Sequence, residues 1–346
     1  MKIAYIYCPI PVHGHRNGII SQCLTWAEGL RKLGNKVDLI SCWEDYDWSS
    51  YDIIHLFGST GTWFYALIKE LLDYNRNVVW SPICDDTTPA KKQRIKTFLG
   101  SNRLHVFSLP FIRSKAYQLP IRIFARSEYE KDYLIKAYRA KKESFEIVPL
   151  GLSYSDSYDK VTKENFCFHL STLYQPRKNV IRLIQAAKKY NFNLVLAGTK
   201  GTDKEFAPLK EAIGNAANIK VLGRISEEKK KELYIRAKVF ALPSVSEGVG
   251  IVALDAAHYG CDIVMTDFGG PKEYYNGMAE IVDPYDIDSI GCAVVKLMSS
   301  THQPQLKEYV DREYCFDRIA EKLENAYKSV VEQNLPYQRV RKRHNG

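Results

Sequence analysis

Two carboxylates stand eight positions apart in the segment SVSEGVGIVALDAAHYG, at Glu247 and Asp255, and Gly248 and Gly250 lie between them. The preceding run VFALPS predicts a strand, and IVALDAAHYG predicts a helix that begins at Ile251. Glycines in a strand-to-helix turn let the backbone approach a ligand, and the free N–H groups of a helix start favour an anion. A plainer alternative makes Glu247 a charge that complements the helix dipole and Asp255 a surface residue.

Two further loops carry residues suited to phosphate. The segment TDFGGPKEYY places Gly269 and Gly270 after the next predicted strand, and Pro271 favours a helix start there. The segment STLYQPRKNVIRLI places Arg177 and Lys178 at a turn before another helix. Arg binds oxygens in a fork and Lys supplies a point charge, whereas a merely basic helix start is disfavoured by the dipole. We therefore expect three loops to converge on a phosphate-bearing ligand.

The elements that must position these loops follow from hydrophobic pattern. Short β-branched or aromatic runs alternate with longer amphipathic segments, which is typical of βαβ units on parallel sheets. The predicted strands are 2–8, 36–42, 52–58, 77–84, 122–127, 144–151, 165–173, 193–198, 219–223, 239–244, 262–267 and 280–284. The clearest predicted helices are 21–34, 63–74, 128–140 and 316–333.

This rhythm restarts after the polar stretch LSYSDSYDKVTKEN, which is typical of a linker between domains. We predict an α/β protein with two Rossmann-like doubly wound domains, residues 1–155 and 156–315, that face a central cleft. Ligands of open α/β sheets bind beyond the carboxyl ends of the strands, so the cleft is the expected site. Residues 336–346 form a predicted basic tail.

Composition bounds the class of protein. The 346 residues are 45% hydrophobic and 26% charged, which suits two globular domains. The eight cysteines are scattered singly with no C-x-x-C pair, so we expect neither a structural metal nor a redox couple. Neither a secretory leader nor a membrane span is predicted, and we expect a cytoplasmic protein.

Positive charge is concentrated in residues 90–142, which contain 14 Lys or Arg and 3 Asp or Glu, a net +11. Anionic lipid, a phosphorylated substrate or a solvated basic face are the open explanations. Nucleic acid is the weakest partner because no recognition motif accompanies the charge. Exposed apolar residues in the same segment would place the protein peripherally on the cytosolic membrane face, and the candidates are Phe107, Leu109, Phe111 and Ile112.

The order of several motifs resembles the retaining glycosyltransferases of family 4, the glycosyl transferases group 1, with the two-domain GT-B fold. The motifs are RSEYEKDYL, IVPLGLS, PRKN, LGRISEEKKKELYIRAKVFALPS, SEGVG with Asp255, FGGPKE and FDRIAEKLENAY. The resemblance covers most of the chain. It implies that the C-terminal domain binds a nucleotide-sugar donor and the N-terminal domain an acceptor. It also implies that the helix at about 316–333 packs back on the N-terminal domain.

The resemblance implies roles for donor-binding residues. Arg177 and Lys178 would neutralise the diphosphate, Glu247 would contact the transferred sugar, and Asp255 would bind the ribose hydroxyls. The family has glutamate where this chain has Asp255, one methylene shorter. Further donor contacts would come from the turn and from two more distant positions: Gly248, Gly250, Ile251, Gly18 and Arg224, the last near the base with Gly223.

A second departure from the family stands beside Gly18, where Asn17 replaces the usual glycine. Near the acceptor many relatives carry a histidine or aspartate, and here Asp85 is the candidate for orienting the acceptor hydroxyl. Its plainer alternative is a turn acid, because DDTTP has strong turn character.

The implied reaction moves a sugar, with retention, from a UDP- or GDP-linked donor to a glycan or lipid-linked acceptor, in surface polysaccharide or glycolipid synthesis. Two cations and helix starts would stabilise the leaving diphosphate, so no metal or other cofactor is expected. An epimerase or a non-catalytic sugar-nucleotide-binding protein of the same architecture stays open.

Two other patterns suggest metal sites. Asp45 and Asp47 resemble the D-x-D pair of the other glycosyltransferase fold, but they follow a strand of the predicted acceptor domain. His13 and His15 lack a third ligand at useful spacing. Neither pattern is expected to bind a metal.

Overall fold

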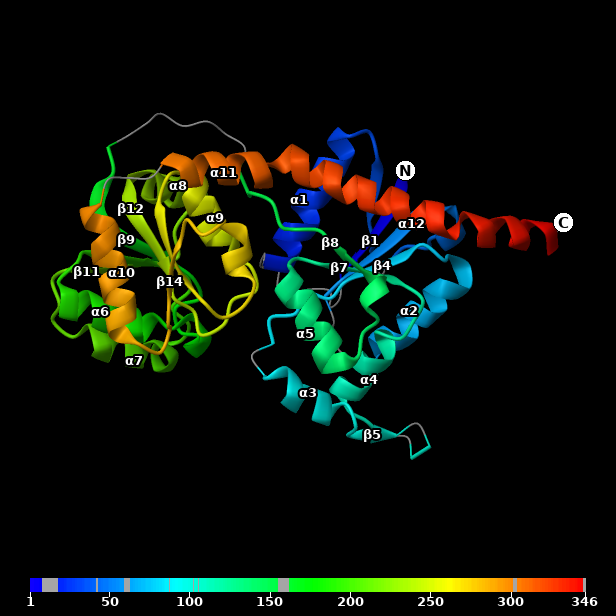
Figure 1. Cartoon of the computed structure of the whole chain (residues 1–346), viewed down its shortest axis with the longest axis horizontal. Coiled ribbons are helices and arrows are strands. Elements are labelled where there is room, and N and C mark those ends of the chain that lie inside the picture. The colour runs from blue at the N-terminus through cyan, green and yellow to red at the C-terminus, as the bar shows by residue number, and fades with distance from the viewer. Residues whose placement is uncertain are drawn as a thin grey trace. The chain divides into compact units, whose positions relative to one another are not determined.

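The structure is a computed structural model of the chain. It describes residues 1–7, 18–41, 43–58, 63–86, 88–101, 103–104, 106–154, 162–300 and 304–344, with side chains through residue 334. Two compact units are present (Figure 1). Unit 1 comprises Met1–Leu150 and Phe316–Gly346, and unit 2 comprises Gly151–Cys315.

A six-stranded parallel sheet forms the centre of unit 1, in the order β2-β1-β3-β4-β7-β8. The central strand β3 is buried at every position, as expected for a parallel strand covered on both faces. The strands are β1 (Lys2–Tyr7), β2 (Lys36–Leu39), β3 (Ile53–Phe57), β4 (Val78–Ser81), β7 (Arg122–Ala125) and β8 (Phe145–Ile147).

Helices cover both faces of this sheet. One face packs against α2 (Trp63–Tyr74), α4 (Leu109–Ala116) and α5 (Glu128–Tyr138), with Trp80 and Tyr117 in a tilted aromatic pair. The other face carries α1 (Gly18–Lys32) and α12 (Phe316–His344), which contact each other. Close packing of these two helices uses a glycine, because a Cβ at Gly29 would lie 2.7 Å from the Cβ of Ala320.

The basic segment of unit 1 has structure that the sequence did not predict. It contains α3 (Ala90–Lys96) and a short antiparallel hairpin of β5 (Gly100–Ser101) and β6 (Val106–Phe107), followed by α4. In Figure 1 β5 lies beyond α3 and α4, at the margin of the unit.

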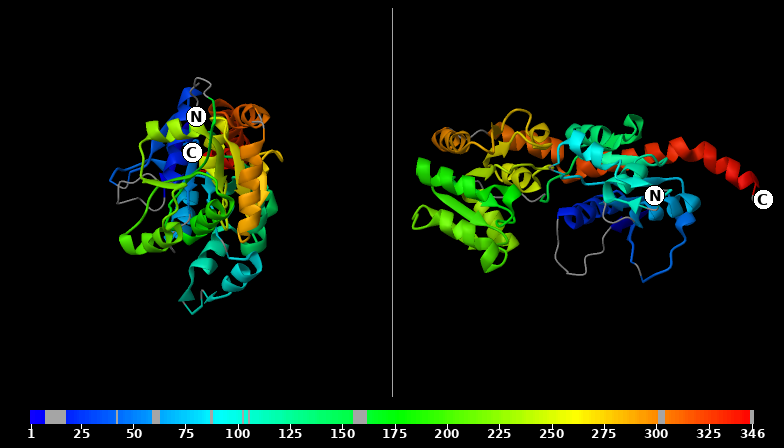
Figure 2. Two further views of the ribbon diagram at one scale, coloured as in Figure 1. Left: turned by 90° about the vertical axis from the view of Figure 1, so that its left-hand side faces the viewer. Right: turned by 90° about the horizontal axis from the view of Figure 1, so that it is seen from below.

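Unit 2 repeats the same plan. Its six parallel strands run in the order β11-β10-β9-β12-β13-β14. Figure 2 shows the helices of this unit on both sides of the sheet. The strands are β9 (Glu164–Leu170), β10 (Leu194–Ala197), β11 (Ile219–Gly223), β12 (Ala237–Leu242), β13 (Asp262–Thr266) and β14 (Glu280–Val282).

The helices of unit 2 divide into two layers. One layer contains α6 (Val180–Tyr190), α7 (Asp203–Ile213) and α10 (Ile287–Ser299), whose apolar faces form one core cluster with the sheet. The other contains α8 (Glu227–Arg236), α9 (Ile251–His258) and α11 (Pro304–Tyr314). The predicted α/β class with two doubly wound Rossmann-like units is therefore confirmed.

The last helix is longer than its sequence pattern predicted, because α12 continues to His344 through the basic tail. At its buried side Tyr327 contacts the Nδ1 of His55 and donates to the hydroxyl of Tyr5 at 3.1 Å. None of the helices that the structure describes combines the length and the apolar character needed to cross a membrane.

Candidate functional site

The loops at the carboxyl edge of the unit 2 sheet form the candidate site. In a parallel sheet these loops lie side by side in the order of the strands. The loop after β9 carries Arg177 and Lys178, the loop after β12 carries Glu247, and Gly269 follows β13. The structure therefore gathers the three loops that the sequence predicted to converge.

Lys178 and Glu247 form the centre of this cluster. The Nζ of Lys178 lies 2.6 Å from Oε2 of Glu247, and both side chains are largely buried, with 13% and 8% exposed. Ser244 donates its hydroxyl to the same carboxylate oxygen at 3.0 Å. Arg177 is more open, donating to the carbonyl of Ser246 at 3.2 Å while its Nη1 lies 3.9 Å from the other Glu247 oxygen. The two basic side chains and the Glu247 carboxylate therefore lie together at the carboxyl edge of the unit 2 sheet.

The backbone fixes Glu247 from the next loop. Its N–H donates to the carbonyl of Phe268 at 3.2 Å, and Glu247 pairs with Gly269 in an isolated parallel bridge. Gly269 has a φ of +111°, and a Cβ there would lie 1.8 Å from the Glu247 carbonyl oxygen. Only glycine fits this approach. Gly269, the first glycine of the FGGPKE segment, therefore lets this loop hold the backbone of Glu247 in place.

Gly250 performs a related task at the start of α9. It adopts a left-handed conformation with φ +72°, and a Cβ there would lie 3.0 Å from the Met265 methyl group. Gly248 precedes it in the same turn, and Ile251 is the first residue of the helix. Ala253 and Leu254 both donate to the carbonyl of Gly250, at 2.8 and 3.2 Å. The first N–H groups of a helix in general lack partners within it, which suits an anion.

Asn179 ties the cluster together and was not predicted. Its backbone is left-handed, with φ 59°, and its side-chain amide donates to the carbonyls of Pro243 at 2.9 Å and Pro284 at 2.6 Å. The loops after β9, β12 and β14 are therefore bonded through one buried side chain. The sequence feature that could have indicated Asn179 is its place at the end of the PRKN motif, residues 176–179.

His169 is a second buried group that sequence reasoning missed. At the end of β9 its Nδ1 contacts the carbonyl of Ala241 at 2.7 Å and its Nε2 contacts the Ser171 hydroxyl at 2.7 Å. Burial lowers the pKa of His169 to about 4, against the opposing effect of the Ala241 carbonyl. The imidazole is therefore neutral at pH 7 and acts as a hydrogen-bonding link beneath the loops.

Asp255 lies inside α9 and is only 2% exposed. Its Oδ1 accepts from the backbone N–H of Ser153 at 2.8 Å. Burial raises the pKa of Asp255 to about 6, although the Ser153 contacts lower it. The alternative in which Asp255 is a surface residue is therefore wrong. Contact with a ribose hydroxyl requires an oxygen of this carboxylate to be uncovered.

Arg224 stands further along the same edge. Its Nε donates to the Thr199 hydroxyl at 3.3 Å, so the loops after β10 and β11 meet there. In unit 1, Gly18 is the first residue of α1, and a Cβ at Gly18 would meet no atom within 4 Å. Asn17, His13 and His15 lie outside the described residues.

Asp85 belongs to a buried ionic network at the carboxyl edge of the unit 1 sheet. Its Oδ1 lies 2.8 Å from the Arg126 guanidinium, which also bonds Glu130. Burial opposes the charge on Arg126, but the two carboxylates outweigh it and hold the pKa of Arg126 well above its usual value. The Asp85 side chain is 37% exposed, so one face of an ion-paired carboxylate remains open to solvent.

The D-x-D pattern has a structural use. Asp47 caps the short 3₁₀ helix Trp48–Ser50 by accepting from the backbone N–H of Ser49 at 3.0 Å. Over the described residues, no three His, Cys, Asp or Glu side chains gather into a group that could hold a metal ion.

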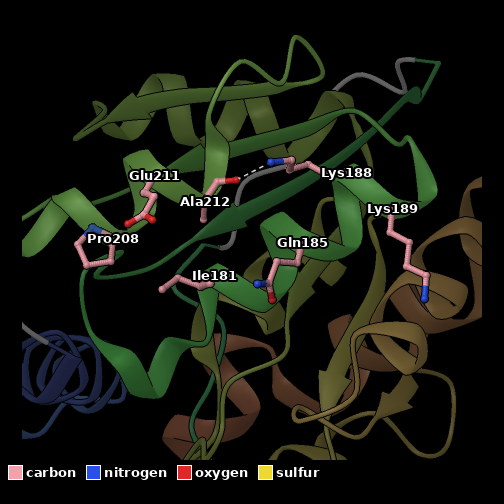
Figure 3. A pocket seen from close by; sticks show the side chains of 7 residues that line it. All are labelled: Ile181, Gln185, Lys188, Lys189, Pro208, Glu211 and Ala212. Atoms are coloured by element: carbon pink, nitrogen blue, oxygen red, sulfur yellow. Dashed lines mark hydrogen bonds between the residues drawn. The ribbon is translucent and has the colours of Figure 1, made fainter.

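A shallow groove of about 720 Å³ lies between α6 and α7, away from this cluster (Figure 3). Lys188 donates to the carbonyl of Ala212 across it at 3.0 Å. None of the predicted site residues lines the groove. Its walls are Ile181, Gln185, Lys188, Lys189, Pro208, Glu211 and Ala212.

The fold is that of the GT-B glycosyltransferases, which solved structures share over nearly the whole chain. Sucrose-phosphate synthase from Thermosynechococcus elongatus superposes with a TM-score of 0.73 at 15% identity, covering 96% of this chain and 99% of that one. Anabaena HepE, determined in complex with UDP and glucose, gives 0.70 at 15% identity, covering 95% of this chain and 100% of that one.

Residues 153–313 match the model of the family described as glycosyl transferases group 1. An uncharacterized glycosyltransferase of Methanocaldococcus jannaschii is 31% identical over 169 residues, 45% of this chain and 43% of the relative. The O-antigen chain mannosyltransferase B of Escherichia coli is 26% identical over 140 residues, 38% and 36% of the two chains. The matching segments thus span less than half of these relatives.

Proposed function

We propose that this protein is a retaining glycosyltransferase that moves a sugar from a UDP- or GDP-linked donor to a glycan or lipid-linked acceptor. The observation that carries the proposal is the Lys178–Glu247 ion pair at the sheet edge, with Arg177 and the glycine turn of α9 beside it. This arrangement combines cations and N–H donors for a diphosphate with a carboxylate for sugar hydroxyls. The similarity to E. coli O-antigen mannosyltransferase B supports a role in surface polysaccharide or glycolipid synthesis.

In the proposed reaction the bond from the anomeric carbon to the diphosphate oxygen breaks, and its electron pair stays on the diphosphate. The acceptor oxygen bonds to the anomeric carbon on the same face, and its proton passes to the departing phosphate oxygen. Lys178 and Arg177 stabilise the charge that develops there, so the step needs no divalent ion. Asp85 would accept a hydrogen bond from the acceptor hydroxyl in unit 1.

Donor binding must rearrange the ion pair. Lys178 forms an ion pair with Glu247, and a bound diphosphate would compete with Glu247 for the ammonium group of Lys178. Glu247 would then be released to accept from sugar hydroxyls while Ser244 continues to hold it. Within the pair each charge offsets part of the cost of burying the other.

A thermal-shift screen of UDP- and GDP-sugars, with and without EDTA, tests the donor site. We expect one nucleotide family to stabilise the wild type, independent of EDTA, and the shift to fall strongly in Lys178→Ala and Glu247→Ala. Lys188→Ala, an exposed lysine of the same unit, is the matched control and should keep the shift. If no sugar nucleotide stabilises the wild type, or if Lys178→Ala responds like it, the donor site is wrong.

A further inference from the structure

An exposed apolar surface in unit 1 is not used by the proposed reaction. Of the seventeen large hydrophobic side chains that are exposed among the described residues, seven fall within residues 95–109. They are Ile95 (67%), Phe98 (63%), Leu99 (62%), Leu104 (72%), Val106 (53%), Phe107 (46%) and Leu109 (37%). We call this set, which lies on α3, the β5–β6 hairpin and the start of α4, the hairpin patch. Such clustering marks an interaction surface.

The chain segment that carries the hairpin patch has charges of one sign. Residues 87–127 contain nine Lys or Arg and no Asp or Glu. Of these cations, Lys91, Lys92, Arg94 and Arg103 are exposed. A protein partner of ordinary composition would leave several of these cations unpaired, whereas an anionic surface complements all of them.

The local structure of the patch is a short hairpin with a few ring contacts. The strands of the hairpin are only two residues long, so it offers little ladder for pairing with another chain. The guanidinium of Arg139 lies 5.1 Å from the Phe98 ring centroid, and Phe107 stacks near Phe111. Ile112, which the sequence suggested would be exposed, is instead 8% exposed because α4 turns it into the core.

We propose that the hairpin patch docks on an anionic lipid bilayer. Its apolar side chains would enter the boundary between headgroups and acyl chains, while Lys91, Lys92, Arg94 and Arg103 contact the headgroups. This role is independent of the proposed sugar transfer, because it uses other residues and needs no sugar nucleotide. Interfacial binding of this kind is reversible and depends on both the buried apolar side chains and the attraction of the cations to anionic lipid. Loss of either contribution should therefore release the protein from the membrane.

Flotation of the full chain with vesicles, without any sugar nucleotide, tests the proposal. We expect binding to phosphatidylcholine vesicles that contain about 30% phosphatidylglycerol, weak binding to pure phosphatidylcholine, and release at high salt. Lys91→Glu/Lys92→Glu should lower partitioning at least about 25-fold, since each lost cation accounts for about fivefold. Leu99→Ser/Leu104→Ser should lower it about tenfold or more, because both side chains are exposed and apolar.

Matched controls lie outside the patch. Lys204→Glu/Lys210→Glu makes the same charge change on exposed positions of α7, and Leu33→Ser/Leu39→Ser removes two exposed leucines of unit 1. Both controls should bind vesicles like the wild type. Binding that ignores anionic lipid, no binding at all, or equal losses in patch and control variants would overturn the proposal. So would a dimer that Leu99→Ser/Leu104→Ser dissociates without any vesicle binding, which would make the patch an interface between two copies.

Discussion

Glu247 depends on partners from several loops, and its chemistry follows from them. Lys178 and Ser244 bond one carboxylate oxygen, Arg177 lies near the other, and Gly269 admits the backbone that carries it. A carboxylate that is 8% exposed and accepts a hydrogen bond from Ser244 has little freedom to rotate. Such rigidity suits a residue that must meet one hydroxyl of a bound sugar.

The raised pKa of Asp255 predicts how the stability of the protein depends on pH. Its folded pKa of about 6 is above the ordinary value of 3.8, so between these values the folded state binds more protons than the unfolded state. The stability of the wild type should therefore fall, relative to Asp255→Asn, as pH rises from about 4 to about 6. The expected change is on the order of 1–3 kcal/mol. Urea denaturation of both proteins across this range measures it.

Asparagine is the informative substitution because its side-chain oxygen can still accept from the Ser153 N–H. Asp45→Asn, at an exposed position, supplies the control and should follow the wild type at every pH. Parallel curves for wild type and Asp255→Asn would contradict the account of a desolvated carboxyl.

At the scale of elements, α12 is fastened to unit 1 by a buried polar chain. The hydroxyl of Tyr327 contacts His55 and donates to the hydroxyl of Tyr5. The Nε2 of His55 in turn contacts the Ser81 hydroxyl at 2.8 Å. Burial holds the pKa of His55 well below its usual value, so the imidazole is neutral. The C-terminal helix is therefore part of the core of unit 1 despite its distance along the chain.

Tyr327→Phe should destabilise unit 1 by about 1–3 kcal/mol, because it leaves a buried ring nitrogen of His55 without its partner. Thermal or urea unfolding measures the loss. Lys328→Ala, at the exposed neighbouring position, removes only an ion pair with Glu324 and should change stability by less than about 1 kcal/mol. Equal effects of the two substitutions would show that the buried chain does not fasten the helix.

At the scale of the whole molecule, hydrophobic alternation predicted both principal sheets well. Each predicted strand overlaps an observed one, and the helix 63–74 matches α2. Long runs of β-branched and aromatic residues report burial on both faces, which is why their positions were readable. The segment 90–116 was not predicted, since seven of its large apolar side chains are exposed and its strands are two residues long.

The site was predictable in part for the same kind of reason. Arg177, Lys178 and Glu247 follow strand ends, and a parallel sheet brings such ends together. The bonds of Asn179 to Pro243 and Pro284, and of Asp85 to Arg126, join residues 41 to 105 positions apart, and no local pattern encodes them. The sequence therefore located the loops, whereas the structure supplied the bonds that hold them.

The most direct test of the account is to follow a stabilising sugar nucleotide by ¹H NMR with wild type, Glu247→Gln and Lys178→Ala, supplying glycan and lipid-linked acceptors. We predict that the wild type releases nucleoside diphosphate and that the transferred sugar first appears in the anomeric configuration of the donor. Release should be about 10²–10³-fold slower in Lys178→Ala. Conversion of the donor to its epimer without release, or binding with no reaction, would contradict glycosyl transfer and leave an epimerase or a binding protein.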